Sequence, residues 1–209
     1  MKKLLISLVC ALTLVTGATA QSKLDKIKES LPPFKLGAQA GFNVSWLSQS
    51  GFNSHAGFNF GATAMFDAGD LIKDTYVRGS FLVNRIGYDG HGFTGVKETG
   101  NAWYLEIPVR YGYGYLLNND WTLLGETGPY IAIGTGGTVK RDIGLDEDYF
   151  GGDVYDFDRF DFGWGFHVGA LYDQHHQVML GWDFGFVDLN NKQNIKNRNF
   201  MISYAYYFL

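Results

Sequence analysis

The chain has 209 residues, enough for one domain, and combines 17% aromatic residues and 28 glycines with only 4 prolines. Its net charge is −4 and it has no basic run, which argues against nucleic-acid binding. Beyond the first twenty residues there is no cysteine, and no stretch is long and apolar enough for a membrane-spanning helix. Disulfides, thiol nucleophiles and thiolate metal sites are therefore excluded from that part of the chain.

Residues 1–20 have the features of a secretory signal peptide. Lys2-Lys3 precede an apolar run over 4–17, and Ala18-Thr19-Ala20 supplies the small residues that signal peptidase requires, so we expect cleavage after Ala20. A lipoprotein signal is the alternative, but Cys10 lies inside the apolar run and lacks small residues before it. Cleavage would leave 15 basic and 21 acidic residues, a formal charge of −6.

Residues 21–34 form a charged leader that differs from the rest of the chain. Leu24, Ile27 and Leu31 recur at helical spacing, and Pro32-Pro33 ends the run. We expect this leader on the periplasmic side, as a mobile tether or as a short amphipathic helix on the inner lip of a barrel.

After residue 34 the apolar residues recur with a period of two, which indicates strands. Eight segments follow this pattern: 35–47, 55–67, 75–88, 102–113, 121–134, 160–172, 177–189 and 198–209. Most are long enough for a tilted strand to cross a bilayer, which takes roughly 9–11 residues. One face of each segment is apolar, with Trp and Tyr frequent toward its ends, and the other face is glycine and polar.

The distribution of charge decides between a soluble barrel and a membrane barrel. Several charged residues share one face of their strands, namely Arg78, Glu106, Arg110, Glu126, Asp161 and Asp183. A water-soluble barrel would have polar residues outside and large apolar residues inside. The pattern instead predicts an all-β protein over 35–209, a single eight-stranded antiparallel transmembrane β-barrel with up-and-down meander topology, in the outer membrane of a Gram-negative-type envelope.

The connections follow the same plan. Short turns are predicted near 68–74, 117–120 and 173–176, and longer loops at 89–101, 135–159 and 190–197, with a modest one near 48–54. Short periplasmic turns that alternate with longer extracellular loops are typical of outer-membrane barrels. Both ends of the barrel are then expected on the periplasmic side.

Four segments resemble a known family. They are YLEIPVRYGYGY (Tyr104–Tyr115), GPYIAIGTGG (Gly128–Gly137), RFDFGWGFHVGALYD (Arg159–Asp173) and RNFMISYAYYFL (Arg198–Leu209). They are similar to the PorT-like outer-membrane β-barrel domain, and the likeness covers essentially the whole mature chain. The resemblance implies an eight-stranded barrel. The family's namesake is tied to type IX secretion and gliding, whereas most members have no assigned activity.

The lumen is the first candidate site. Arg78, Glu106, Arg110 and Glu126 are predicted to point inward from three neighbouring strands, and His167 and Asp183 extend the same network. The interior of an eight-stranded barrel is just wide enough to be filled by side chains. Two acids and two bases can neutralise one another there, so we predict a polar plug, with a gated ion path as the alternative.

The long acidic loop is the second candidate. Its carboxylates include Asp146, Glu147, Asp148, Asp153, Asp156 and Asp158. Oxygen ligands at this density could bind calcium, although the spacing is not that of an EF-hand. A solvated extracellular loop is the simpler interpretation.

An enzyme is the least favoured interpretation, although His91, Asp89 and Ser54 or His55 could converge at the outer rim. We therefore predict a non-enzymatic, monomeric barrel without a cofactor. It would act through its extracellular loops in envelope structure, interaction or support of a secretion apparatus. Its expected partners are outer-membrane lipids and lipopolysaccharide, and envelope or secretion-system proteins. A small passive channel is the first alternative function and a lipid-modifying enzyme the second.

Overall fold

The computed structural model describes residues 34–91, 95–142, 144, 146–152, 156–190 and 194–208. The predicted signal peptide and all of the leader except Phe34 lie outside the described residues. None of the described residues belongs to a helix that is long and apolar enough to cross a membrane.

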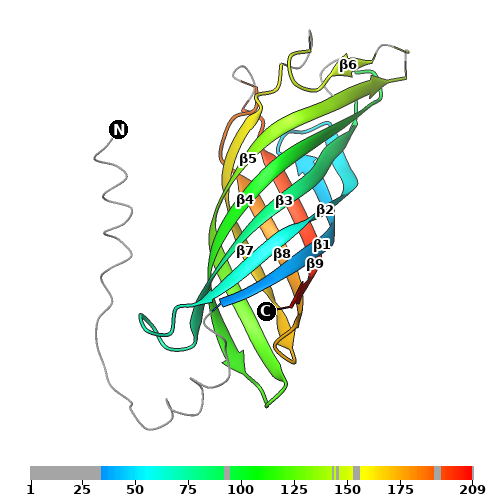
Figure 1. Ribbon diagram of the computed structural model, residues 1–209. Coiled ribbons are helices and arrows are strands. Elements are labelled where there is room, and N and C mark those ends of the chain that lie inside the picture. The colour runs from blue at the N-terminus through cyan, green and yellow to red at the C-terminus, as the bar shows by residue number, and fades with distance from the viewer. Residues whose placement is uncertain are drawn as a thin grey trace, which may run out of the picture. The chain divides into compact units, whose positions relative to one another are not determined.

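The described residues form nine strands (Figure 1). Eight are long: β1 (Phe34–Leu47), β2 (Phe52–Asp67), β3 (Thr75–Gly90), β4 (Glu98–Leu116), β5 (Trp121–Arg141), β7 (Phe160–Tyr172), β8 (His176–Gly185) and β9 (Asn197–Tyr207). The short strand β6 (Glu147–Asp148) pairs with β5 at Thr138 and Val139.

The eight long strands close into an antiparallel barrel. Each pairs with the next long strand along the chain, and β9 pairs back with β1 from Gly37↔Tyr207 to Leu47↔Asn197. The topology is an up-and-down meander, so the eight-stranded all-β prediction is confirmed. Strand β6 extends the pairing of β5 beyond Ile133↔Phe160, the last pair that β5 makes with β7.

The two faces of the wall differ as the sequence predicts. Large apolar side chains lie outside, and Phe42 is 75% exposed, whereas the Arg110 side chain on the inner face is almost fully buried. Trp103 and Trp182 also lie outside. This arrangement suits an outer surface covered by lipid. In water the large aromatic side chains would be exposed to solvent, whereas in a bilayer they contact lipid.

Both ends of the described chain lie at one end of the barrel, where the Phe208 amide donates to the Leu36 carbonyl at 2.9 Å. We call this the terminal end, and it carries the connections 68–74, 117–120 and 173–175. The opposite end, the loop end, carries the connections 48–51, 91–97, 142–159 and 186–196. Strand β6 belongs to the loop end (Figure 1).

The predicted extents of three loops are wrong. Strand β3 continues to Gly90, β4 begins at Glu98 and β5 reaches Arg141, so residues 89–101 and 135–159 are partly strand, and the loop near 48–54 is confined to 48–51. Conversely, the strand predicted over 177–189 ends at Gly185. Strand pairing requires only backbone hydrogen bonds, which continue into glycine-rich and polar residues beyond the apolar band.

The lumen is filled in three layers along the barrel. An apolar cluster at the terminal end contains Met65, Tyr76, Leu124, Leu171, Met179, Ala205 and Tyr207. A larger, mostly aromatic cluster at the loop end contains Leu47, Phe52, Ile86, Tyr88, Ala102, Tyr104, Tyr130, Ala132, Val139, Tyr149, Phe150, Phe157, Leu189 and Ile195. Buried charged and titratable side chains lie between these clusters, and we call them the polar layer: Arg78, Glu106, Arg110, Glu126, Asp161, His167 and Asp183.

Candidate functional site

The polar layer contains all six charged or titratable residues that the sequence placed in the lumen. Strand β3 supplies Arg78, β4 supplies Glu106 and Arg110, and β5, β7 and β8 supply Glu126, His167 and Asp183. All six are buried. Successive side chains of a strand point to opposite faces, so the alternation of residues along each strand was enough to predict that these six side chains point into the lumen.

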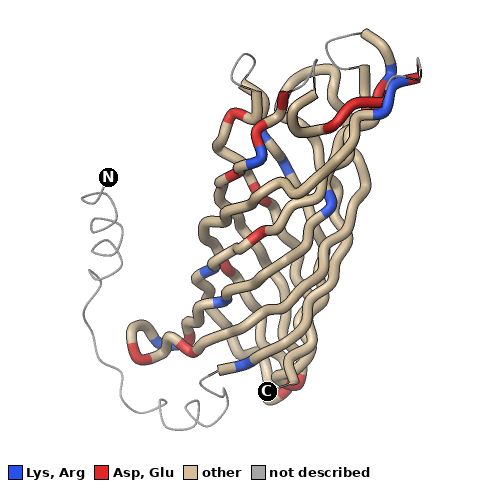
Figure 2. Tube along the Cα trace, turned by 45° about the horizontal axis from the view of Figure 1, so that its top comes forward, with Lys and Arg blue, Asp and Glu red and all other residues tan. Residues whose placement is uncertain are grey.

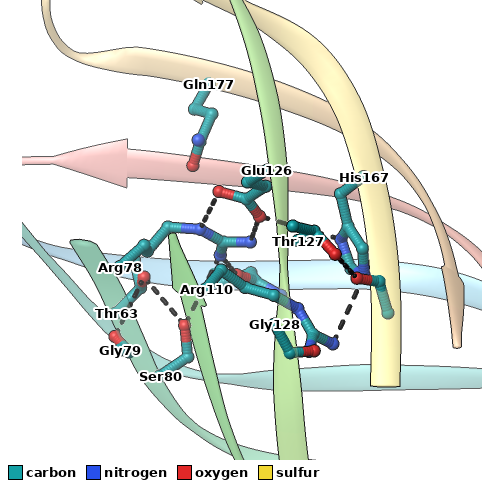
Figure 3. A network of polar contacts seen from close by, with 12 residues as sticks. Thr63, Arg78, Gly79, Ser80, Arg110, Glu126, Thr127, Gly128, His167 and Gln177 are labelled. Carbon is teal, nitrogen blue, oxygen red and sulfur yellow. Dashed lines mark hydrogen bonds and ion pairs between the residues drawn. The ribbon is translucent and has the colours of Figure 1, made fainter. Parts of the chain in front are cut away.

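The first ion pair joins Arg78 to Glu126 across the lumen (Figure 3). The Nε atom of Arg78 donates to Oε2 of Glu126 at 3.0 Å, and Nη2 donates to the second carboxylate oxygen, so the contact is bidentate. Gln39 accepts from Nη1 of Arg78 at 2.8 Å, and the Tyr76 hydroxyl donates to Glu126 at 3.2 Å. These bonds satisfy both partners, which a buried pair requires for stability.

The second ion pair joins Arg110 to Asp183 at 2.6 Å, and Arg110 also donates to the Gly128 carbonyl. The Nε2 atom of His167 lies 3.0 Å from the same Asp183 oxygen, and its Nδ1 atom lies 3.8 Å from Glu126. His167 therefore lies between the two pairs, and Figure 3 shows it beside Glu126. The result is one continuous network across the lumen.

The structure gives the pairing of charges, which the sequence left open. Glu106 forms no ion pair among the described residues, and it accepts a hydrogen bond from Asn84 at 2.8 Å. The partner of Arg110 is Asp183 instead. Asp161 was predicted to point inward but not to join the site. It accepts hydrogen bonds from Tyr130 at 3.1 Å and Asn197 at 2.9 Å. The alternation of residues along its strand could have identified Asp161 as a site residue.

Glycines make room for the network. A Cβ atom at Gly165 would collide with the Asp183 carboxylate and the Arg110 guanidinium, whereas one at Gly125 would have no atom within 4 Å. We expect Gly165→Ala to lower the free energy of unfolding by about 1–3 kcal/mol, because the second ion pair must move. Gly125→Ala is the matched control. Urea unfolding in detergent micelles measures both, and equal stability of the two variants would contradict this role of Gly165.

The loop-end cluster closes the lumen with residues from the connection 142–159. Tyr149, Phe150 and Phe157 are buried against inward-facing Tyr88 and Tyr104. We call the described residues 146–152 and 156–159 the cap. They are not the simple solvated loop that the sequence suggested, because three of their aromatic side chains lie inside the barrel.

Arg141 holds the cap to the barrel rim. Its guanidinium lies 3.3 Å from Glu98 on β4 and 3.0 Å from Glu147 on β6. The Arg159 side chain, at the other side of the cap, lies over the Phe150 ring at 4.9 Å and donates to the Gly134 carbonyl. Ion pairs and aromatic packing thus fix the cap at both of its ends.

The acidic residues of this connection are spread over different surroundings. Asp146, Asp148, Asp156 and Asp158 are exposed, Glu147 is held by Arg141, and Asp153 lies outside the described residues. Within the described part of the chain, no group of three or more His, Cys, Asp or Glu residues is placed to hold a metal ion. A calcium site in this loop stays a prediction.

At the outer rim, two of the four residues considered for an enzyme come together. The Nδ1 atom of His55 lies 2.9 Å from Asp89, and Thr99 donates to the other oxygen of Asp89 at 2.6 Å. No hydroxyl among the described residues is hydrogen-bonded to the His55 ring, and neither Ser54 nor His91 joins the pair. Among the described residues, this end therefore has a His–Asp pair whose histidine ring contacts no hydroxyl, and the Thr99 hydroxyl beside it bonds the acid instead.

A closed barrel with an apolar outside and a charged, filled inside defines a transmembrane β-barrel of the outer-membrane type. The chain belongs to the outer membrane protein beta-barrel domain family, whose model matches residues 8–208. This family implies outer-membrane localisation. No curated protein matches the chain.

Solved structures of similar fold come from several outer-membrane proteins. Ail, the attachment invasion locus protein of Yersinia pestis, solved in complex with the heparin analogue sucrose octasulfate, is 16% identical. The match covers 85% of this chain and 100% of Ail, with a TM-score of 0.46. Neisserial surface protein A is 15% identical, with coverage of 83% and 97% and a TM-score of 0.48. The outer membrane enzyme PagL is 10% identical, with coverage of 80% and 98% and a TM-score of 0.47.

Proposed function

We propose that the protein is a non-enzymatic outer-membrane barrel with a closed lumen that acts through its extracellular surface. The observation that carries this proposal is the filling of the lumen in three layers, apolar at both ends and ion-paired in the middle. An ion that crossed the barrel would have to displace both apolar clusters and break buried ion pairs. Such steps are costly in a low-dielectric interior.

The loop end offers the larger surface for contact with other molecules. It carries the two longest connections, and charged residues of both signs gather there (Figure 2). The exposed carboxylates Asp146, Asp148, Asp156 and Asp158 are available to a partner. Within this proposal the loop end faces the outside of the cell, where it would contact lipopolysaccharide or other envelope proteins.

The finer role that we propose is envelope structure, interaction or support of a secretion apparatus. The resemblance of Tyr104–Tyr115 and the other three segments to the PorT-like domain supports it. A signal peptide cleaved after Ala20 would deliver the chain to the periplasm for insertion as a monomer. Deletion of the gene should then impair surface assembly or protein secretion, and an unchanged secreted and surface proteome would count against this role.

A planar-bilayer recording tests the closed lumen. We expect the purified protein to give no steady single-channel conductance, because the three layers leave no open path. The control is a barrel of known conductance reconstituted from the same detergent. Steady conductance from this protein, with uniform amplitude, would favour a passive channel and overturn the closed-lumen proposal.

One observation favours a second candidate, a lipid-modifying enzyme at the outer rim. The His55–Asp89 contact at 2.9 Å resembles the part of a catalytic triad in which an acid orients a histidine. If purified protein hydrolyses or transfers acyl chains of outer-membrane lipids, His55→Ala should abolish that activity while His91→Ala leaves it unchanged. Absence of lipid turnover, measured by mass spectrometry of reconstituted lipids, would eliminate this candidate.

A further inference from the structure

The polar layer contains more negative than positive charge. Arg78 and Arg110 face four buried carboxylates, which belong to Glu106, Glu126, Asp161 and Asp183. Two of the carboxylates are matched by the two arginines, and Glu106 and Asp161 form no ion pair among the described residues. Even a positive charge on His167 would leave an excess of one negative charge. An uncompensated buried carboxylate is expensive, so some other species is needed to balance the layer.

Glu106 and Asp161 lie in one row of the barrel wall. Glu106 on β4 pairs with Ala132 on β5, and Ala132 pairs with Asp161 on β7. All three side chains are buried on the inner face, and Tyr130, two residues before Ala132 on β5, donates a hydrogen bond to Asp161. Only β5 separates the two residues in the barrel wall.

Nearby cations do not resolve the imbalance. Arg110 lies four residues after Glu106 on β4, but its ion pair is with Asp183. Arg198 donates its hydrogen bonds to the backbone carbonyls of Gly185 and Asn197 and forms no ion pair with Asp161 among the described residues.

The lumen holds buried polar atoms without hydrogen-bond partners in the described structure, and they include four nitrogens, Asn59 Nδ2, Arg110 Nε, His167 Nδ1 and Gln177 Nε2. Others are oxygen atoms. They include Asp161 Oδ1 and Asp183 Oδ2 and, from neutral side chains, Tyr104 OH, Asn199 Oδ1 and Asn43 Oδ1. Tyr104 is 1% exposed and lies on the inner face of β4, two residues before Glu106. Asn199 pairs in register with Asp183. Buried polar atoms are normally satisfied, so this group of acceptors indicates a missing positive partner or water.

We propose that the polar layer binds one hard divalent cation between Glu106 and Asp161, with water and the neutral oxygens completing its coordination. Two carboxylates match its charge of +2, and the Tyr104 and Asn199 oxygens are the kind of ligand such ions take. Calcium fits better than magnesium, because it accepts six to eight oxygens in flexible geometry. Since apolar clusters close both ends, the ion is enclosed during folding and exchanges slowly. Its role is structural, because it neutralises the layer that fills the lumen.

The test uses the full-length protein extracted from outer membranes in detergent and passed through gel filtration in EDTA. Elemental analysis then measures calcium and magnesium. We expect one chelator-resistant divalent ion per wild-type chain and none in Glu106→Gln/Asp161→Asn, whose side chains keep their shape but lose both charges. Asp146→Asn/Asp148→Asn is the matched control, because it removes two exposed carboxylates of the cap, and it should retain the ion.

A second measurement tests whether the bound ion stabilises the folded barrel. Wild-type protein refolded from urea in EDTA should unfold at a lower temperature than protein refolded with calcium chloride, and the double variant should show no difference. The single variant Glu106→Gln serves if the double variant fails to fold, which heat-dependent migration in electrophoresis reveals. Wild-type protein that holds neither ion, with equal stability in EDTA and calcium, would overturn the proposal. If its stability then rises with acidification, protons neutralise the two acids instead.

Discussion

Replacing Arg78 with methionine should lower the free energy of unfolding by about 3–5 kcal/mol, one of the two largest effects expected in this protein. The Arg78 side chain is buried and forms a bidentate ion pair with Glu126. Glu126 also accepts a hydrogen bond from Tyr76 and lies near His167. Without the guanidinium, the Glu126 carboxylate stays buried with no matching cation. Urea unfolding in lipid vesicles, followed by tryptophan fluorescence, measures the change.

Two controls make the result interpretable. Arg78→Met/Glu126→Met removes the whole pair, and its cost should be smaller than that of Arg78→Met alone, because no unmatched charge remains. Lys73→Met removes an exposed cation in the terminal-end turn 68–74 and should change stability by less than about 0.5 kcal/mol. If the double variant is as unstable as the single one, the Arg78 side chain acts through packing and not through its charge.

Phe157→Ala should release the cap from the lumen. The Phe157 ring is 2% exposed and packs on Tyr149 at 4.7 Å and on Tyr88 at 6.2 Å between ring centroids. Loss of a buried aromatic side chain costs about 3–5 kcal/mol, which is comparable to the free energy that holds one loop segment in place. Added protease should therefore cleave the variant within 142–159 in intact cells, while the wild-type chain resists.

Asp156→Ala is the matched control for this prediction, because it changes an exposed side chain next to Phe157. It should remain as resistant as the wild type. Rapid cleavage of the wild-type chain in the same segment would show that the cap is open under native conditions. The Phe157→Ala variant, with its cap released, should still give no steady conductance, because the polar layer and the terminal-end cluster continue to fill the lumen.

These predictions separate two contributions to the closed lumen. The polar layer depends on charges that must find partners, so its variants act on the stability of the whole barrel. The cap depends on aromatic burial in a single connection, so its variants act locally. A role at the cell surface would depend more on the cap and its exposed carboxylates than on the polar layer.

Several parts of the fold could be predicted from the pattern of residues. The strand predicted over 160–172 coincides with β7, and the inward positions of Arg78, Glu126 and Asp183 are confirmed. These features are local, because the period-two alternation places each side chain on one face whatever its neighbours are. The ends of strands were predicted less well, since pairing continues past the apolar band through glycine and polar residues in β4 and β5.

The cap was missed for a different reason. The many acidic residues of 135–159 indicate a solvated loop, whereas Tyr149, Phe150 and Phe157 within it indicate burial. Three aromatic side chains in a connection rich in carboxylates are a signal that part of the connection is buried. Where they would be buried could not be derived, because that depends on how the connection turns back over the rim.

By itself, the sequence determined the surroundings of the barrel: apolar residues face lipid on all eight long strands, and charged residues face the lumen on β3, β4, β5, β7 and β8. This follows from the geometry of a strand, which needs no knowledge of its partners. Only the tertiary structure decided that Arg110 pairs with Asp183, that Glu106 and Asp161 have no ion-pair partner, and that Phe157 closes the loop end. Contacts across a lumen depend on the register and stagger of all eight strands together, and no single strand carries that information.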